Sequence, residues 1–113
     1  MESRVTRDGK KNVVVMAWGE GNLECTEVIR PSDLGDAPPG VKLDQIQFTV
    51  ESGTKVYVGW SGDGRFLSVE GRGLLNYYQF DSLQPSTPGQ NLWISVVGEG
   101  AFHLVLDCTK MGA

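Results

Sequence analysis

The sequence predicts an all-β protein, an antiparallel β-sandwich or jelly-roll-like barrel of about eight short strands with little or no helix. One observation is the alternation of apolar and polar residues in short runs, which is the period of a half-buried strand. Another is a Gly-acid-Gly tripeptide that recurs between such runs, because glycine tolerates the positive φ that three-residue hairpin loops require. The tripeptides are Gly19-Glu20-Gly21, Gly62-Asp63-Gly64 and Gly98-Glu99-Gly100.

The first tripeptide is expected to join strands at Asn12–Trp18 and Asn22–Ile29 into a hairpin. Its buried face would carry Val15, Ala17, Leu23 and Cys25. The next segment, Pro31–Gly40, holds three prolines and two glycines. We therefore expect it to be a crossing loop or a cover for a sheet edge.

Two further hairpins are predicted in the middle of the chain. A loop at Ser52–Thr54 would place Val50 opposite Val56 and keep the apolar residues of both strands in register. After the second tripeptide, Arg65–Glu70 is expected to return with Phe66 facing Trp60. The run Leu74–Phe80 also resembles a strand, and Gln84–Gln90, with two prolines, is expected to be a loop.

The last hairpin gives the main candidate for an interaction surface. One of its faces would join two aliphatic runs, beginning at Leu92 and Phe102, in the core. The opposite face should be polar in a free sandwich, yet it is largely apolar. We expect either the Pro31–Gly40 loop or another subunit to cover it. The candidate interface residues on this face are Trp93, Val97, Ala101, His103 and Val105.

The charge distribution divides the chain into a basic N-terminal arm, residues 1–11, and a single β domain, residues 12–113. The whole chain carries −4 and the arm, with four basic and two acidic side chains, carries +2, which leaves −6 on the domain. The arm could reach an acidic neighbour, and its basic residues complete the candidate interface: Arg4, Arg7, Lys10 and Lys11. An acidic body argues against nucleic-acid binding, and no apolar run approaches the roughly 20 residues of a membrane-spanning helix.

No catalytic, metal-binding or cofactor motif is recognised, and we expect the protein not to be an enzyme. Ser95 and His103 would lie opposite each other in the last hairpin, with Asp81 or Asp107 nearby, but no nucleophile elbow or oxyanion hole accompanies them. We expect them to form a polar pair. The aspartates Asp33, Asp36, Asp44 and Asp63 do not have the spacing of an EF-hand loop, although a calcium ion that bridges loops remains an alternative.

The two cysteines are expected to be buried thiols. The first residues lack the apolar core of a secretion signal, so we expect a reducing cytosol, in which Cys25 and Cys108 would stay unbridged. The aromatic residues raise a rival function, a carbohydrate-binding module that stacks sugars on exposed rings. The rings concerned are Trp18, Trp60, Trp93, Tyr57, Tyr77 and Tyr78.

The size of the chain, its acidic loops GEG, GDG and GEG, and the closing run LWISVVGEGAFHLVL resemble the small all-β decoration or cement proteins of tailed bacteriophage capsids. This resemblance implies a structural virion protein, made in the host cytoplasm, that sits on a shell as an oligomer. Its partners would be further copies of itself and a capsid protein, with no nucleic acid and no membrane. It implies no cofactor and identifies no functional residue.

Overall fold

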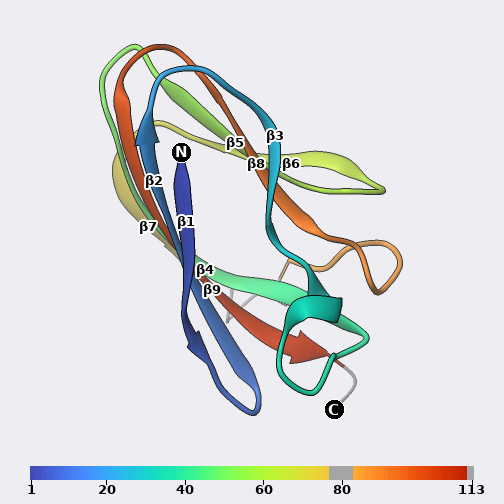
Figure 1. Cartoon of the computed structure of the whole chain (residues 1–113). Coiled ribbons are helices and arrows are strands. Elements are labelled where there is room, and N and C mark those ends of the chain that lie inside the picture. The colour runs from blue at the N-terminus through green and yellow to red at the C-terminus, as the bar shows by residue number, and fades with distance from the viewer. Residues whose placement is uncertain (77–82, 112–113) are drawn as a thin grey trace.

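Nine strands in two antiparallel sheets make up the part of the chain that the computed structural model describes, residues 1–76 and 83–111 (Figure 1). Sheet A has the order β1-β2-β9-β4-β7 and sheet B the order β3-β8-β5-β6. The strands are β1 (Glu2–Asp8), β2 (Asn12–Glu20), β3 (Leu23–Ile29), β4 (Gly40–Val50), β5 (Lys55–Trp60), β6 (Gly64–Val69), β7 (Gly71–Asn76), β8 (Leu92–Val97) and β9 (Ala101–Met111). A short 3-10 helix, η1 (Pro31–Asp33), follows β3. The predicted all-β sandwich with little helix is confirmed.

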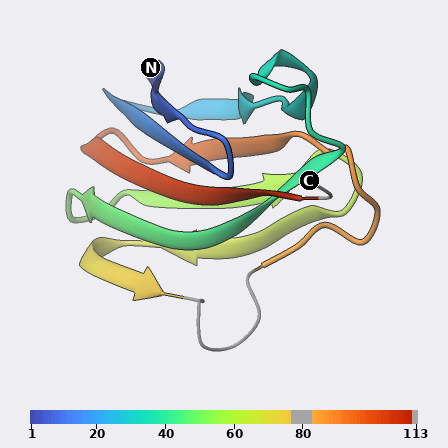
Figure 2. The ribbon, with the colours of Figure 1, turned by 90° about the horizontal axis from the view of Figure 1, so that it is seen from below.

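The two sheets lie face to face, and Figure 2 shows the strands of sheet A following one another from β1 at one edge to β7 at the other. The alternation expected from the sequence places one side chain in two on the inner face of each sheet. Burying each large aliphatic side chain contributes about 1.5–3 kcal/mol, so this layer is the main source of stability. The fully buried large residues include Trp60, Ile29, Leu43, Ile46, Leu92, Ile94, Leu104 and Leu106.

Three of the four predicted hairpins are wrong. The loops after β2, β4 and β8 each lead from one sheet to the other, so the strands that they join are not neighbours. The pairings expected across Gly19–Gly21, Ser52–Thr54 and Gly98–Gly100 are therefore absent. The apolar alternation is satisfied all the same, because Leu104 on β9 and Ile94 on β8 are both buried between the sheets.

The crossing loops bind one another at one end of the sandwich. The backbone N–H of Gly100 donates to Thr54 Oγ1 over 2.8 Å, and that of Gly98 donates to Asn22 Oδ1 over 2.9 Å. A Cβ atom on Gly100 would lie 2.5 Å from Thr54 Oγ1. The glycine at this position is thus needed for the close approach of two loops rather than for a hairpin turn.

The tripeptide Gly62-Asp63-Gly64 does form the predicted hairpin, between β5 and β6, and Gly64 has a φ of 84°. The register differs from the prediction, because Trp60 lies opposite Gly64 and a bulge interrupts the pairing beside Val58. The rings of Trp60 and Phe66 nevertheless stack, with their centroids 5.5 Å apart.

Two other segments have clear positions. The predicted arm contains β1, which pairs with β2 as the edge strand of sheet A. The Pro31–Gly40 segment crosses from sheet B to sheet A and packs at the end of the sandwich, where its Gly35 contacts Asp8, instead of covering an outer face.

The predicted strand Leu74–Phe80 is observed to Asn76, and its remaining residues lie outside the described part of the chain. No helix of the described chain is long enough to cross a membrane.

Candidate functional site

The outward side of sheet A, called face A below, collects five of the nine residues predicted to form an interface. Arg4 lies opposite Met16 and Arg7 opposite Val14 on β2, while alternate residues of β9 point the same way. These five are Arg4, Arg7, Ala101, His103 and Val105. Their common position depends on the pairing of β9 with β2, and not on the predicted last hairpin, which supplied five of the nine residues.

Face A consists of rows of side chains that run across the five strands, since opposed residues in a ladder point to the same side. The central row is Arg4, Met16, Val105, Gln47 and Leu74. One neighbouring row is Glu2, Trp18, His103, Thr49 and Arg72. The row on the other side is Arg7, Val14, Asp107, Gln45 and Asn76.

An apolar band occupies the middle of face A. Val14, Met16 and Trp18 form it on β2, and all three are half-buried. Val105 continues the band onto β9, and Leu74, which is 55% exposed, lies at the β7 edge. The outer face of an antiparallel sheet normally carries polar residues, so this band is unusual. The sequence signal for this band is the run NVVVMAW, which is apolar at both parities of the strand.

The outward side of sheet B, called face B, holds Trp93 and Val97, so the single surface predicted for the last hairpin is split between opposite sides of the molecule. The half-buried ring of Trp93 packs on the backbone of its own chain, because a Cβ atom on Gly59 would lie 2.2 Å from Trp93 Cζ2. The Arg65 guanidinium likewise lies 4.2 Å from the centre of the Tyr57 ring. Face B therefore uses its aromatic rings for packing within the chain.

The predicted pair of Ser95 and His103 does not form. Ser95 lies opposite Tyr57 on sheet B, whereas His103 lies between Trp18 and Thr49 on sheet A. The two side chains thus point away from opposite faces of the sandwich.

No group of three or more His, Cys, Asp or Glu side chains could hold a metal ion within the described residues. Two of the four aspartates considered as ligands are instead bound within the chain. Asp63 accepts hydrogen bonds from the Ser86 hydroxyl and from the Ser86 backbone N–H, which lower the pKa of its carboxyl group. Asp44 is 1% exposed and accepts a hydrogen bond of 2.5 Å from Thr109 Oγ1.

A buried lysine on β9 binds both β1 and the segment that follows η1. Lys110 on β9 forms an ion pair of 2.5 Å with Asp8 on β1, and its Nζ donates to Gly35 O over 2.8 Å. The backbone N–H of Gly35 donates back to Asp8 Oδ2 over 2.8 Å. The hydrogen bond from Lys110, followed by the one from Gly35, lowers the pKa of Asp8. The lysine side chain is only 2% exposed. The contacts among Lys110, Asp8 and Gly35, called the clip below, fix the Pro31–Gly40 segment to sheet A.

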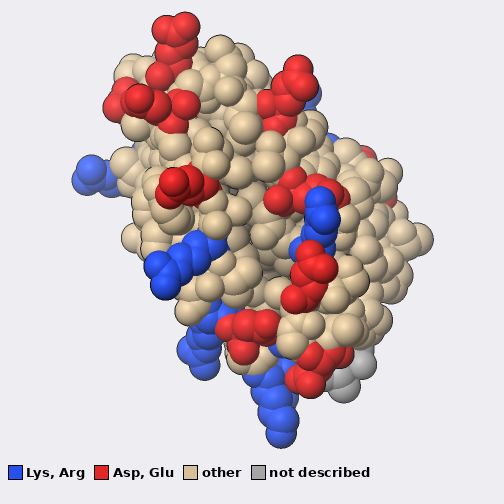
Figure 3. Space-filling view, viewed as in Figure 1, with Lys and Arg blue, Asp and Glu red and all other residues tan. Residues whose placement is uncertain are grey.

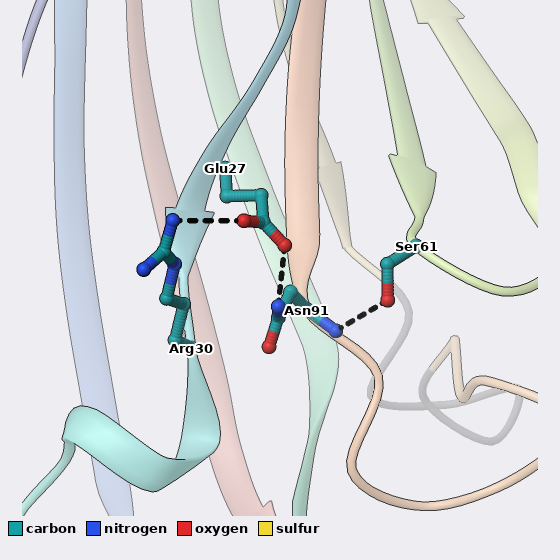
Figure 4. A network of polar contacts seen from close by, with 4 residues as sticks. All are labelled: Glu27, Arg30, Ser61 and Asn91. Carbon is teal, nitrogen blue, oxygen red and sulfur yellow. Dashed lines mark hydrogen bonds and ion pairs between the residues drawn. The ribbon is translucent and has the colours of Figure 1, made fainter.

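A second polar network joins β3, β8 and the turn after β5 (Figure 4). Glu27 accepts from Arg30 over 2.9 Å and also from the side-chain amide of Asn91. The backbone N–H of Asn91 donates to Ser61 Oγ over 3.0 Å. The Glu27 carboxylate is thus used in holding strand ends together, which is a structural role.

The two cysteines are free, as predicted, but only one is buried. Cys108 lies in the core, where burial and then the nearby Asp44 and Asp107 raise the pKa of its thiol. Cys25 is exposed, because β3 bulges between Leu23 and Thr26 and this shifts the alternation that placed it inside.

Charge is distributed unevenly over the surface. Figure 3 shows acidic side chains at the upper end of the molecule, where the loops after β2, β4 and β8 lie. Basic side chains project from the lower end, with several acidic ones beside them. Lys10 and Lys11, the remaining predicted interface residues, lie in the turn between β1 and β2 and not on face A.

No protein-family model and no curated protein matches the chain. Among solved structures, it is similar to a cupin superfamily protein from Desulfitobacterium hafniense, with a TM-score of 0.42 and 11% identity over 98% of this chain and 77% of that one. The cupin domain of Schizosaccharomyces pombe Cnp3 gives a TM-score of 0.43 and 12% identity over 96% of this chain and 62% of that one. A cupin-2 domain containing protein from Shewanella frigidimarina gives 0.36 and 12% identity over 92% and 78%.

The predicted resemblance to bacteriophage capsid decoration proteins is wrong, because these three matching structures are cupin proteins. The prediction of a virion protein that cements a capsid is therefore wrong as well. The alternative, a carbohydrate-binding module, is not supported either. Its aromatic residues do not share a surface, since Trp60 is 2% exposed in the core while Trp18 and Trp93 lie on opposite faces. Tyr77 and Tyr78 lie outside the described residues.

Proposed function

We propose that this protein is a non-enzymatic interaction module that pairs with a second copy of itself through face A. The observation that carries the proposal is the apolar band of Val14, Met16, Trp18 and Val105 on the outward side of a sheet. These four side chains are half-buried, and pairing favours association because it removes their remaining apolar surface from water.

The charges at the two edges of face A favour a second copy as the occupant. Within one row, Glu2 lies on the β1 edge and Arg72 on the β7 edge. The central strand of the five is β9. A two-fold axis along β9 would set β1 of one copy over β7 of the other, so Glu2 would meet Arg72 at both edges. The same axis would bring Val105 of the two copies together at the centre.

The size of face A predicts a weak dimer. Five strands, each about 4.8 Å wide, and three complete rows, each about 6.8 Å deep, cover roughly 24 by 20 Å, or about 500 Å². Two such faces would bury about 1,000 Å², which is near the lower limit for a specific interface. We therefore expect a dissociation constant in the micromolar range.

Sedimentation equilibrium over about 1–300 µM tests the proposal, with two matched lysine variants. Val105→Lys places a charge at the centre of face A and should leave a monomer at every concentration. Val97→Lys changes the same residue type on face B, where Val97 is 58% exposed, and should dimerise like the unmodified chain. A thermal melt confirms that both variants fold. A monomeric unmodified chain over the whole range, or equal dimerisation of the two variants, would contradict the proposal.

A further inference from the structure

A cavity of about 410 Å³ lies at the lower end of the sandwich, where β9 ends at Met111. Its wall on one side is the turn between β1 and β2, and on the other the segment after η1. The end of β9 closes it. This volume falls within the range of about 300–1,000 Å³ that is usual for small-molecule sites. The lining residues are Lys10, Lys11, Asp36, Pro38, Pro39, Lys110 and Met111.

The walls of this cavity are held in place by hydrogen bonds from both sides. The backbone N–H of Lys110 donates to Lys11 O over 2.7 Å, and that of Gly9 donates to Asn12 O over 2.8 Å, so the turn is fixed to β9. The Lys110 ammonium fixes the opposite wall through Gly35 O. A ligand would therefore not have to order either wall, which reduces the entropic cost of binding.

The backbone of the second wall is strained. Asp36 and Ala37 have φ values of 66° and 37°, and neither is glycine. Such conformations cost of order 1–3 kcal/mol each and occur often at binding sites, where the surrounding structure enforces them. Here the clip of Lys110, Asp8 and Gly35 supplies that constraint immediately before the strained pair.

The charges of the lining favour an anion. Lys110 is neutralised by its ion pair with Asp8. Lys10 and Lys11 are exposed and form no ion pair within the described residues, and the one other charge in the lining is Asp36. The net charge of Lys10, Lys11 and Asp36 is therefore +1. The remaining surface is apolar and comes from Pro38, Pro39 and Met111.

We propose that this cavity binds a small amphipathic anion, a carboxylate with a short hydrocarbon chain. The carboxylate contacts the ammonium groups of Lys10 and Lys11 at the mouth. The hydrocarbon chain lies against Pro38, Pro39 and Met111, where it loses contact with water. Asp36 opposes binding by like-charge repulsion and so limits the affinity.

The test is a titration of the ¹⁵N-labelled full chain with sodium hexanoate, followed by amide chemical shifts. We expect the amides of Lys11, Ala37 and Met111 to shift together and to saturate. The double variant Lys10→Gln/Lys11→Gln should bind about fivefold more weakly, since each exposed charge pair contributes about 0.2–1 kcal/mol. Asp36→Asn should bind about twofold more tightly, and Lys55→Gln on face B, the matched control, should bind as the unmodified chain does.

Two further probes of the same chain length, hexylamine and 1-hexanol, separate the charge from the hydrocarbon. Both should bind more weakly than hexanoate at the same amides. The proposal is overturned if hexylamine binds as tightly as hexanoate, if the double lysine variant binds hexanoate unchanged, or if the three amides do not respond to hexanoate at all. Because Val105 does not line the cavity and precedes Met111 by six residues on β9, the Val105→Lys variant should retain hexanoate binding whether or not the chain dimerises.

Discussion

Trp18 and Trp93 occupy similar positions on opposite faces of the sandwich, but their surroundings differ. Both rings point outward from a sheet, and both are half-buried. Trp93 lies against the bare backbone of Gly59, so its contacts are made within the chain. Trp18 lies in a row with Glu2 and His103 and belongs to the apolar band that Val14, Met16 and Val105 complete. A half-buried tryptophan on a sheet therefore indicates a docking surface only where the chain does not already cover it.

The largest effect on stability is expected from Gly59→Ala on face B. The added methyl group would lie 2.2 Å from Trp93 Cζ2 and 2.7 Å from Gly64 O, and the carbonyl belongs to a paired strand that cannot move freely. Overpacking of this kind costs about 1–3 kcal/mol. Urea denaturation measures the loss. Gly9→Ala is the control, since its nearest contact is 3.4 Å, and equal stability of the two variants would show that Trp93 is not packed on Gly59.

The next largest effects are expected from replacing each of the two tryptophans, and they should differ in kind. Trp93→Ala removes a ring that packs within the chain, and we expect a loss of about 2 kcal/mol in the free energy of unfolding. Trp18→Ala should cost less in the monomer, yet it should abolish dimerisation at about 100 µM. Urea denaturation at low protein concentration and sedimentation at high concentration give the two readings. The comparison of the faces fails if Trp93→Ala is the variant that loses dimerisation.

A smaller change in stability is expected from Asp8 on β1, the edge strand of sheet A, and it should depend on pH. The pKa of Asp8 is lowered in the folded protein from its ordinary value of 3.8, so its ionised form stabilises the fold above that pH. This contribution is lost as the pH falls through the folded pKa. Asp8→Asn should lower the melting temperature at pH 7, because Lys110 keeps a buried charge without its partner. Melting curves from pH 7 to pH 2 should show the two proteins converging, and a constant difference would contradict this role for Asp8.

The smallest effect concerns the thiols. Cys25 is exposed on β3, and Cys108 is buried in the core, where burial raises the pKa of its thiol. A thiol reagent such as Ellman's reagent should modify one cysteine per folded chain and both in denaturant. Modification of both thiols in the folded protein would mean that sheet A opens at β9.

The fold class and most of the core could be predicted from the sequence, whereas the pairing of strands could not. Alternation identifies which residues of a strand are buried, as it did for Leu104 and Ile94. It does not distinguish a hairpin within one sheet from a loop that crosses to the other, because both bury the same residues. The distinction lies in contacts such as Gly100 with Thr54, which have no local pattern. Bulges also leave no recognisable pattern in the sequence, and the bulge between Leu23 and Thr26 exposes Cys25.

The candidate site shows the same division between local and long-range information. Val105 and His103 were correctly placed on one outward face, since parity within β9 is local. Trp93 was wrongly placed beside them, because that required β8 and β9 to be neighbours. The clip of Asp8 and Lys110 joins the two ends of the chain, and no spacing in the sequence could have suggested it.

A charge exchange at Glu2 and Arg72 tests the pairing of face A most directly. Glu2→Arg and Arg72→Glu each place like charges together at both edges of the proposed dimer, so each should weaken dimerisation in sedimentation equilibrium at low salt. The double variant restores opposite charges, and we expect it to recover most of the lost affinity. A double variant that dimerises no better than either single variant would contradict the pairing of β1 with β7 of a second copy.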